Sequence, residues 1–377
     1  MISDITNTWV PSMRRYIDEE ALMKLIQRQG YLDFLRRNRD RPIIKVVSGI
    51  RRCGKSTLFR LFKDELLADN VKPEQIISIN FEELEYEHLR DYHALYQYIL
   101  ERMQPNETNY IFLDEIQHVD QFHRVVDSLF VKENTDLYIT GSNAYFMSSD
   151  IATLLTGRYV EIQMLPLSFS EFYHSKYEGN QYSLIPAYEA YLRESSFPYT
   201  QQLGGEDFDI QEYLRGLYNT LLLHDVVARL KINDVTILQD IVRYIMANVG
   251  SLLSPNKIAN SLVSAGRKID NKTVERYLQG LQDSLLLYKV NRYDVRGKEL
   301  LRINAKYYSV DVTLRNLLVG NASRDTGHIL ENIVFLELIR RGYTVYVGQL
   351  AKGECNGCFY ENSYVLINGI GIWHYGN

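Results

Sequence analysis

The sequence predicts an α/β fold: a parallel sheet with helices on both faces, followed by a helical lid, a winged helix and a partial α/β tail. Two observations predict the sheet. Residues 42–48 form a short β-branched run, residues 49–56 a glycine-containing loop, and residues 57–62 have apolar side chains at helical spacing. Residues 109–115 form an apolar run that ends in two acids, as a strand buried on both faces does.

The loop after the first strand has a pattern suited to phosphate. Gly49 to Ser56 reads G-x-x-x-x-G-K-S, the P-loop pattern, so the predicted sheet is of the P-loop NTPase type. Gly49 and Gly54 let the backbone curl round an anion, toward which the loop amides and the helix N-terminus point. Lys55 supplies a charge to the β- and γ-phosphates, and Ser56 a hydroxyl to Mg²⁺. The predicted nucleotide-binding residues are Gly49, Arg52, Cys53, Gly54, Lys55, Ser56 and Thr57.

The two acids after the second strand complete a predicted site for ATP and Mg²⁺. Strands of an open α/β sheet bind ligands at their carboxyl ends. There Asp114 would hold Mg²⁺ together with Ser56, and Glu115 would polarise the attacking water. The alternative, a core strand that ends in two solvated acids, is disfavoured by the P-loop upstream.

Two more positions are candidates for catalysis. Residues 137–143 read as a strand with a polar end, where Ser142 or Asn143 would sense the γ-phosphate or position water. A simple turn fits Gly-Ser-Asn equally well. Arg158 precedes a strand and would act as an arginine finger or sensor, in cis or across a subunit contact; a surface arginine is the alternative.

Together these motifs resemble the AAA-type ATP-binding proteins of bacteria and archaea that are related to archaeal ATPases and have a distinctive C-terminal region. The segments that match are 49–56, 113–115, 139–143, 155–159, 166–172, 307–311 and 327–338. The resemblance implies ATP binding with slow hydrolysis and favours catalytic roles for Ser142, Asn143 and Arg158. It does not identify a client.

The second half of the sequence has the signals of a winged helix-turn-helix. Ser254-Pro255 is a helix start, and Asp270 or Asn271 caps the next helix. Two strand-like runs around Gly297 would form the wing. The predicted domains are an AAA-like ATPase core over 1–165, a helical lid or connector over 166–235, a winged helix over 236–310 and a partial, degenerate restriction-endonuclease-like region over 311–377.

The winged-helix segment is basic although the chain is not. Residues 254–308 hold eleven Lys or Arg and five Asp or Glu, whereas the chain as a whole has a net charge of -5. A basic winged helix could bind duplex DNA through Lys272 and Arg276 on the recognition helix and Arg296 and Lys298 on the wing. The alternative is a module for intramolecular or protein contacts.

The C-terminal region departs from a nuclease. The resemblance places the helix glutamate of a nuclease site at Glu331, but no lysine follows Lys352 and the strand acid is missing. We therefore expect no nuclease activity, and the changed composition of the tail leads to the hypothesis that it is truncated or altered by a frameshift. Cys355 and Cys358 form a lone C-x-x-C, too few ligands for zinc.

Composition excludes several classes of protein. No apolar run approaches the ~20 residues that span a bilayer, no signal peptide is visible, and three cysteines suit a reducing cytoplasm. We expect a cytoplasmic, Mg-dependent ATPase that acts as a nucleotide-controlled switch on a protein or DNA partner, as a monomer or an oligomer. The alternatives are a DNA-associated protein in which ATP is structural or regulatory, and a P-loop kinase. Cys53 beside the nucleotide predicts sensitivity to oxidation.

Overall fold

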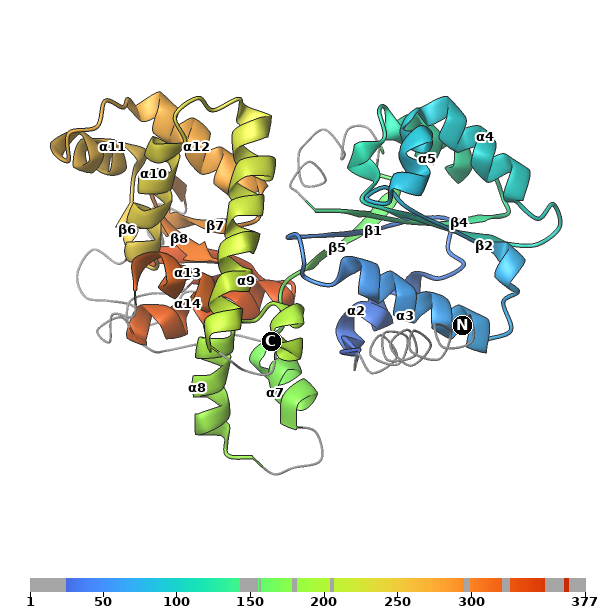
Figure 1. Cartoon of the computed structure of the whole chain (residues 1–377), viewed down its shortest axis with the longest axis horizontal. Coiled ribbons are helices and arrows are strands. Elements are labelled where there is room, and N and C mark those ends of the chain that lie inside the picture. The colour runs from blue at the N-terminus through green and yellow to red at the C-terminus, as the bar shows by residue number, and fades with distance from the viewer. Residues whose placement is uncertain are drawn as a thin grey trace, which may run out of the picture.

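The computed structural model describes residues 25–142, 155, 157–177, 182–203, 207–294, 299–320, 326–349 and 363–365. Over these residues the chain forms two five-stranded sheets, one in each half of the molecule, and helices pack round both (Figure 1). No helix in the described ranges is long and apolar enough to cross a bilayer.

The first sheet is parallel throughout, with the spatial order β2-β3-β4-β1-β5. Its strands are β1 (Ile44–Gly49), β2 (Ile76–Asn80), β3 (Asn109–Asp114), β4 (Thr135–Gly141) and β5 (Tyr159–Met164). β1 and β3 are buried along their whole length, as the sequence predicts for both. Because all strands run the same way, their carboxyl ends meet at one edge of the sheet.

Helices cover both faces of this sheet. One face carries α2 (Gln29–Asn38) and α3 (Lys55–Ala68), the other α4 (Tyr92–Arg102) and α5 (Phe122–Phe130) (Figure 1). Successive residues of β1 pack into different cores: Val46 lies in the α4–α5 core and Val47 in the α2–α3 core. Short helices η1 (Pro73–Gln75), η2 (Leu84–Arg90) and η3 (Ile116–His118) complete the connections. The predicted α/β core is confirmed.

The position of β4 decides the geometry of the site. β4 lies between β1 and β3, with Gly141 opposite Ser48 of β1 and Ile139 opposite Leu113 of β3. Its polar carboxyl end therefore lies between the P-loop after β1 and the two acids after β3. The order of strands along the chain does not reveal this neighbourhood.

A helical segment connects the two halves, as predicted for residues 166–235. It consists of α7 (Phe169–Tyr177), α8 (Leu184–Glu194), η4 (Pro198–Gln202), α9 (Asp207–Thr220) and η5 (Leu221–Ala228). η5 is a π-helix that continues α9, a feature the sequence does not signal. Such wide turns are rare and are often found at functional positions.

The next elements include the three helices and the hairpin that the sequence predicts, with a short strand between the first two helices; that they act as a winged helix stays a prediction. They are α10 (Val235–Ala247), β6 (Leu252–Leu253), α11 (Pro255–Ser264), α12 (Asn271–Asp283), β7 (Leu287–Asp294) and β8 (Glu299–Ser309). The predicted caps are present: Ser254 Oγ accepts the N–H of Lys257 at 3.2 Å, and Asp270 Oδ1 that of Thr273 at 2.7 Å. Use of this module on DNA stays a prediction.

The C-terminal elements extend the same sheet instead of forming one of their own. They are α13 (Val312–Val319), α14 (Thr326–Arg340), β9 (Thr344–Gln349) and β10 (Ser363–Val365). β9 pairs in parallel with β7, and β10 with β9, which gives the order β10-β9-β7-β8-β6. The edge of β7 opposite β8 offers unpaired backbone groups, which β9 satisfies. The domain boundary that the sequence predicts at residue 310 therefore falls within one continuous sheet. Cys355 and Cys358 lie outside the described residues.

Candidate functional site at the carboxyl edge of the parallel sheet

The P-loop joins the end of β1 to the start of α3. Gly49 is the last residue of β1, and Lys55 is the first of α3. A Cβ atom on Gly49 would lie 2.3 Å from the carbonyl oxygen of Met164, and Gly54 has a φ of +105°. Any other residue would clash at the first position and be strained at the second, so both glycines are required by the backbone.

Lys55 is buried within the loop, with 4% of its surface exposed. Its Nζ donates to the carbonyl oxygens of Gly49 at 3.0 Å and Ile50 at 3.4 Å, and lies 3.1 Å from Oε1 of Glu115. Burial opposes the positive charge, but the neighbouring Glu115 outweighs it, so the pKa of Lys55 is raised. The ammonium therefore remains charged at the place where the pattern predicts phosphate.

The two acids are held by side chains of β4 and of the turn after β3. Glu115 has a φ of +55°, a left-handed conformation that is unusual for glutamate. Thr140 Oγ1 donates to Asp114 Oδ1 and accepts the N–H of Glu115 at 2.9 Å. Gln117 Nε2 donates to Glu115 Oε2 at 2.5 Å and to Ser142 Oγ at 3.3 Å. Three side chains, those of Thr140, Gln117 and Ser142, thus fix the two acids.

The environment pushes the pKa values of the two acids in opposite directions. Burial raises the pKa of Asp114, although contacts with Ser56 and Thr140 oppose this. Burial also acts on Glu115, but the Lys55 ammonium outweighs it and lowers the pKa of Glu115. Adjacent carboxyl groups whose pKa values are pushed apart can take different chemical roles.

Ser56 and Asp114 lie together, as the predicted magnesium site requires. The contact that Ser56 makes with Asp114 favours the ionised carboxylate. A hydroxyl and a carboxylate are hard oxygen ligands, which suit Mg²⁺. Among the described residues no group of three or more His, Cys, Asp or Glu could hold a metal. The donor set therefore fits an ion that keeps water and phosphate oxygens as its other ligands, as Mg²⁺ does.

Cys53 is fully buried below the loop. Burial raises the pKa of its thiol, whose thiolate is the reactive form. This environment argues against the predicted sensitivity to oxidation. The sequence places the thiol beside the nucleotide but does not show that it faces the protein interior.

The two arginines of the loop face the second half of the molecule. Arg51 Nη1 lies 3.0 Å from Glu82 Oε1 at the end of β2, and its Nε lies 3.6 Å from Asp225 Oδ2 in η5. Arg52 is exposed, has a φ of +67° and acts electrostatically on Tyr213 of α9. Nucleotide binding by Arg52 stays a prediction, as does that by Thr57 in the first turn of α3.

The structure separates Arg158 from this site. β5 runs parallel to β1, with Tyr159 opposite Ile44 and Met164 opposite Gly49. Arg158 therefore lies where β1 begins, about 17 Å of strand away from the loop. It is exposed, and its guanidinium carbon is 5.5 Å from the ring centroid of Phe130. A cis arginine finger does not fit this position, which leaves a role across a subunit contact or a plain surface arginine. Asn143 lies outside the described residues.

Several functional neighbours escaped sequence reasoning. Thr140 belongs to a segment that resembles the family, but threonine in a strand is ordinary. Gln117 follows the acids by two residues and could have been noticed there. Arg28 donates to the carbonyl oxygen of Cys53 at 3.2 Å and pairs with Glu171 at 2.8 Å. No motif surrounds Arg28, so only the fold reveals its contact with the loop.

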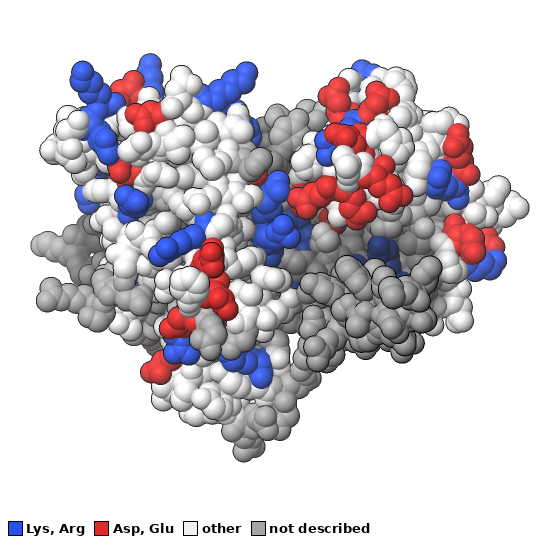
Figure 2. All heavy atoms as spheres, viewed as in Figure 1, with Lys and Arg blue, Asp and Glu red and all other residues white. Residues whose placement is uncertain are grey.

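The structure describes two of the four residues that the sequence predicts to bind DNA. Lys272 and Arg276 lie on the exposed side of α12, close to exposed Arg267 and Lys268 in the turn before it. Figure 2 shows Lys and Arg side chains projecting from the end of the molecule that carries α11 and α12. Arg296 and Lys298 lie outside the described residues.

The contacts of Glu331 are those of a residue that stabilises the fold. Its Oε1 accepts hydrogen bonds from Lys306 Nζ and from Tyr308 OH, both at 2.6 Å. These contacts tie α14 to β8. A carboxylate engaged in this way anchors a helix, and the absence of nuclease activity stays a prediction.

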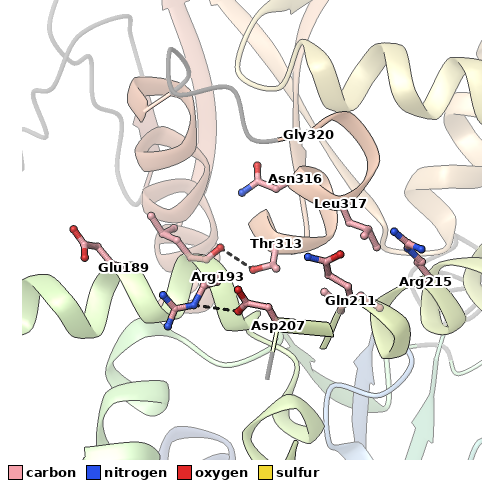
Figure 3. Close-up of a pocket in the computed structure, with 11 residues that line it drawn as sticks. Glu189, Arg193, Asp207, Gln211, Arg215, Thr313, Asn316, Leu317 and Gly320 are labelled. Atoms are coloured by element: carbon pink, nitrogen blue, oxygen red, sulfur yellow. Dashed lines mark hydrogen bonds and ion pairs between the residues drawn. The ribbon is translucent and has the colours of Figure 1, made fainter. Parts of the chain in front are cut away.

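A separate cavity of about 560 Å³ lies between α8, α9 and α13 (Figure 3). Charged groups in its wall pair with each other: Arg193 Nε lies 3.3 Å from Asp207 Oδ1. Thr313 Oγ1 donates to the carbonyl oxygen of Leu192 at 3.0 Å. Because Arg193, Asp207 and Thr313 already have partners within the wall, this cavity is a weaker candidate site than the P-loop edge.

Two sequence families match the chain. A family described as an AAA domain matches residues 41–173, and a domain of unknown function (DUF8612) matches residues 185–325. An uncharacterized protein of Haemophilus influenzae is 40% identical over 333 residues, which are 88% of this chain and 82% of the relative. An uncharacterized protein of Methanocaldococcus jannaschii is 32% identical over 319 residues, 80% of this chain and 67% of the relative.

A solved structure shares the fold. The Walker-type ATPase of Pyrococcus abyssi superposes with a TM-score of 0.53 at 16% identity, covering 78% of this chain and 95% of that one. At this identity the likeness concerns the fold alone. The parallel sheet, the P-loop, the AAA-domain match and the Haemophilus influenzae relative lead to one conclusion: the chain belongs to the AAA-type P-loop ATPases.

Proposed function

We propose that this protein is an Mg-dependent ATPase in which Glu115 polarises the attacking water and the nucleotide state controls a protein or DNA partner. The observation that best supports hydrolysis is the junction of Lys55, Asp114 and Glu115 at one edge of a parallel sheet. The shared hydrogen bonds of Thr140 add to it. When bound beside Ser56 and Asp114, Mg²⁺ would neutralise charge on the phosphate oxygens.

Lys55, Glu115 and Gln117 have separate roles in the proposed reaction. Lys55 exchanges its contact with Glu115 for the phosphates, since both lie within reach of one flexible ammonium. That exchange frees the Glu115 carboxylate, which the adjacent Lys55 keeps ionised before phosphate arrives, to accept a hydrogen bond from water. Gln117 continues to hold the second carboxylate oxygen of Glu115. Water is thus oriented only after phosphate has drawn Lys55 away.

Substitutions at the site test hydrolysis. Lys55→Ala should abolish nucleotide binding, measured by titration. Glu115→Gln should keep nucleotide binding and reduce phosphate release about 10²–10⁴-fold, the usual contribution of a positioned general base. Glu107→Gln, an exposed acid on the same domain, is the control and should change neither. Nucleotide binding by Lys55→Ala at wild-type affinity would refute the assignment. ATP turnover that needs an added acceptor, with the phosphoryl group transferred to that acceptor and no free phosphate, would favour the P-loop kinase.

Contacts across the molecule support the switch. Arg51 of the loop pairs with Asp225 of η5. In the helical turn that follows Asp225, Arg229 pairs with Asp283 of α12. A Cβ atom on Gly280 of α12 would lie 2.5 Å from Leu230 Cδ1. The helical segment that carries Leu230 therefore packs closely against α12. A change of the loop on nucleotide binding therefore has a packed route to α12, the predicted recognition helix.

The alternative is a DNA-associated protein in which ATP is structural or regulatory. The exposed cations on and before α12 favour it. Retention on duplex DNA should fall with salt, and Lys272→Gln with Arg276→Gln should flatten the slope of log K against log salt by about 2, one unit per lost phosphate contact. Lys72→Gln on the ATPase core is the control. No retention at low salt removes DNA as the partner and leaves a protein client.

A further inference from the structure

Arg28 lies buried behind the P-loop and uses its whole guanidinium group. Only 3% of its surface is exposed. Its Nε and Nη2 each donate to one carboxylate oxygen of Glu171 at 2.8 Å. Its Nη1 donates to the carbonyl oxygens of Cys53 at 3.2 Å and Leu165 at 2.6 Å, and its Nη2 to that of Pro166 at 3.2 Å. One side chain therefore connects the loop, the end of β5 and α7.

The contact with Cys53 fixes the direction of a loop amide. The described chain has no cis peptide bonds, and in a planar trans peptide the C=O and the next N–H point in opposite directions. Because the carbonyl of Cys53 points at Arg28 on the protein side, the N–H of Gly54 points away from it, toward the side on which the P-loop pattern places phosphate. The φ of +105° at Gly54 leaves this peptide easy to rotate unless something holds it.

We propose that Arg28 is a positioning residue that holds the Cys53–Gly54 peptide so that the Gly54 N–H is presented to the phosphates of a bound nucleotide. This inference rests on the proposed nucleotide binding. Orientation matters here more than charge, because Glu171 neutralises Arg28 at close range. A lysine would keep the charge but could not form the fork to Glu171 and reach three carbonyl oxygens as well.

The same neighbourhood supplies a matched control. Arg340 of α14 is also largely buried, and its Nη2 donates to the carbonyl oxygen of Pro166 at 2.8 Å. Within the part of the chain that the structure describes, Arg340 forms no hydrogen bond or ion pair with the loop. Arg28→Lys and Arg340→Lys therefore both remove a guanidinium from the Pro166 carbonyl, and only Arg28→Lys releases the Cys53 carbonyl.

The sequence allows Gly54 to be observed alone. Cys53–Gly54 is the only Cys-Gly pair in the chain. Labelling with carbonyl-¹³C cysteine and ¹⁵N glycine therefore gives one correlated NMR signal, that of the Gly54 amide. In the wild type this signal should shift when the protein is saturated with ADP.

The experiment compares ADP affinity, the Gly54 signal and the melting temperature in the full chain. We expect Arg28→Lys to weaken ADP binding at least tenfold and to reduce the ADP-induced shift of Gly54 by more than half. Arg340→Lys should stay within twofold of wild type, although its melting temperature also falls. Equal ADP affinity and equal Gly54 shifts in the two variants would overturn the inference.

A second variant tests the inference if Arg28→Lys does not fold. Glu171→Gln leaves Arg28 in place but removes the carboxylate that orients it, so the same changes should appear in weaker form. If Arg28→Lys does not fold, wild-type affinity and a wild-type Gly54 shift in Glu171→Gln overturn the inference. If the wild type itself binds no ADP, the proposed function fails; if it binds ADP and the variants bind equally well, only the role of Arg28 fails.

Discussion

Thr140 shows how a single ordinary side chain can organise the candidate site. Its hydroxyl donates to Asp114 and accepts from the backbone of Glu115, so it sets the angle between two neighbouring acids. The cost of this arrangement falls on Asp114, which is buried without a cationic partner as close as the one Glu115 has. A group kept for function at the expense of stability is a common feature of active sites.

Replacing Asp114 should therefore stabilise the nucleotide-free protein. The pKa of Asp114 is raised in the folded state, so its ionisation destabilises the fold as the pH rises through the ordinary and then the raised pKa. Asp114→Asn removes this effect and should raise the thermal unfolding midpoint at pH 7. The gain should disappear below about pH 4, where the wild-type acid is protonated in both states. Thermal unfolding without Mg²⁺ measures it; a variant less stable than wild type at pH 7 would contradict the prediction.

The second residue-scale prediction concerns Cys53. Its thiol is inaccessible and its pKa is raised, so both conditions for reaction are absent. We expect iodoacetamide to leave the Cys53 peptide unmodified in the native protein and to modify it fully after denaturation, as measured by mass spectrometry. Rapid modification under native conditions would restore the oxidation hypothesis.

At the scale of elements, short acidic motifs act as caps that join helices to distant loops. Glu171 Oε2 accepts the N–H of Ser168, and Ser168 Oγ accepts that of Glu171, a reciprocal cap at the start of α7. Asp311 begins α13 by accepting the N–H of Leu314 at 2.6 Å. Two of the segments that resemble the family thus have a structural explanation.

Asp311→Ala should be far more damaging than loss of an ordinary cap. Its Oδ2 also accepts from the backbone and hydroxyl of Ser196 and from the Ser195 hydroxyl, so removal leaves several buried donors unpaired. We expect a loss of about 3 kcal/mol in the free energy of unfolding. Asp234→Ala removes the exposed cap of α10 and should cost about 1 kcal/mol. Urea unfolding compares the two, and equal losses would show that the buried network contributes nothing.

Much of the fold could be predicted from local signals in the sequence. Contacts between segments that lie far apart in the sequence could not. The glycines of the loop, the buried strand before Asp114 and the caps at Ser254 and Asp270 depend on neighbours in sequence, which a pattern can reveal. The separation of Arg158 from the loop depends on where β5 pairs. The contact of Arg28 with Cys53 depends on how α2 packs. Neither leaves a periodic trace in the sequence.

At the scale of the whole molecule, the two halves share one continuous hydrophobic core. It runs from Phe59 and Phe62 of α3 through α9 to α12 and β8. The polar link beside it, from Arg51 to Asp225, joins the nucleotide loop to the π-helix. A packed interface of this kind can transmit a small displacement as a discrete shift of one half.

Asp225→Asn should uncouple the halves. The variant keeps the size of the side chain but removes the charge that faces Arg51. In wild type we expect ATP to change the hydrogen exchange of α12; in Asp225→Asn the change should be lost while ATP still binds. Asp240→Asn, whose carboxylate pairs with Arg267 away from the loop, is the control and should respond as wild type. An undiminished response in Asp225→Asn would exclude this route.

The ion pair between Lys55 and Glu115 also has a consequence for ligand choice. In the nucleotide-free protein the principal cation of the loop is already neutralised at 3.1 Å, so an arriving anion competes with an internal one. A single phosphate or sulfate offers less charge for this competition than a triphosphate, which brings several negative groups at once. If the loop binds nucleotide as proposed, we expect a nucleoside triphosphate to displace Glu115 from Lys55 more readily than inorganic phosphate does.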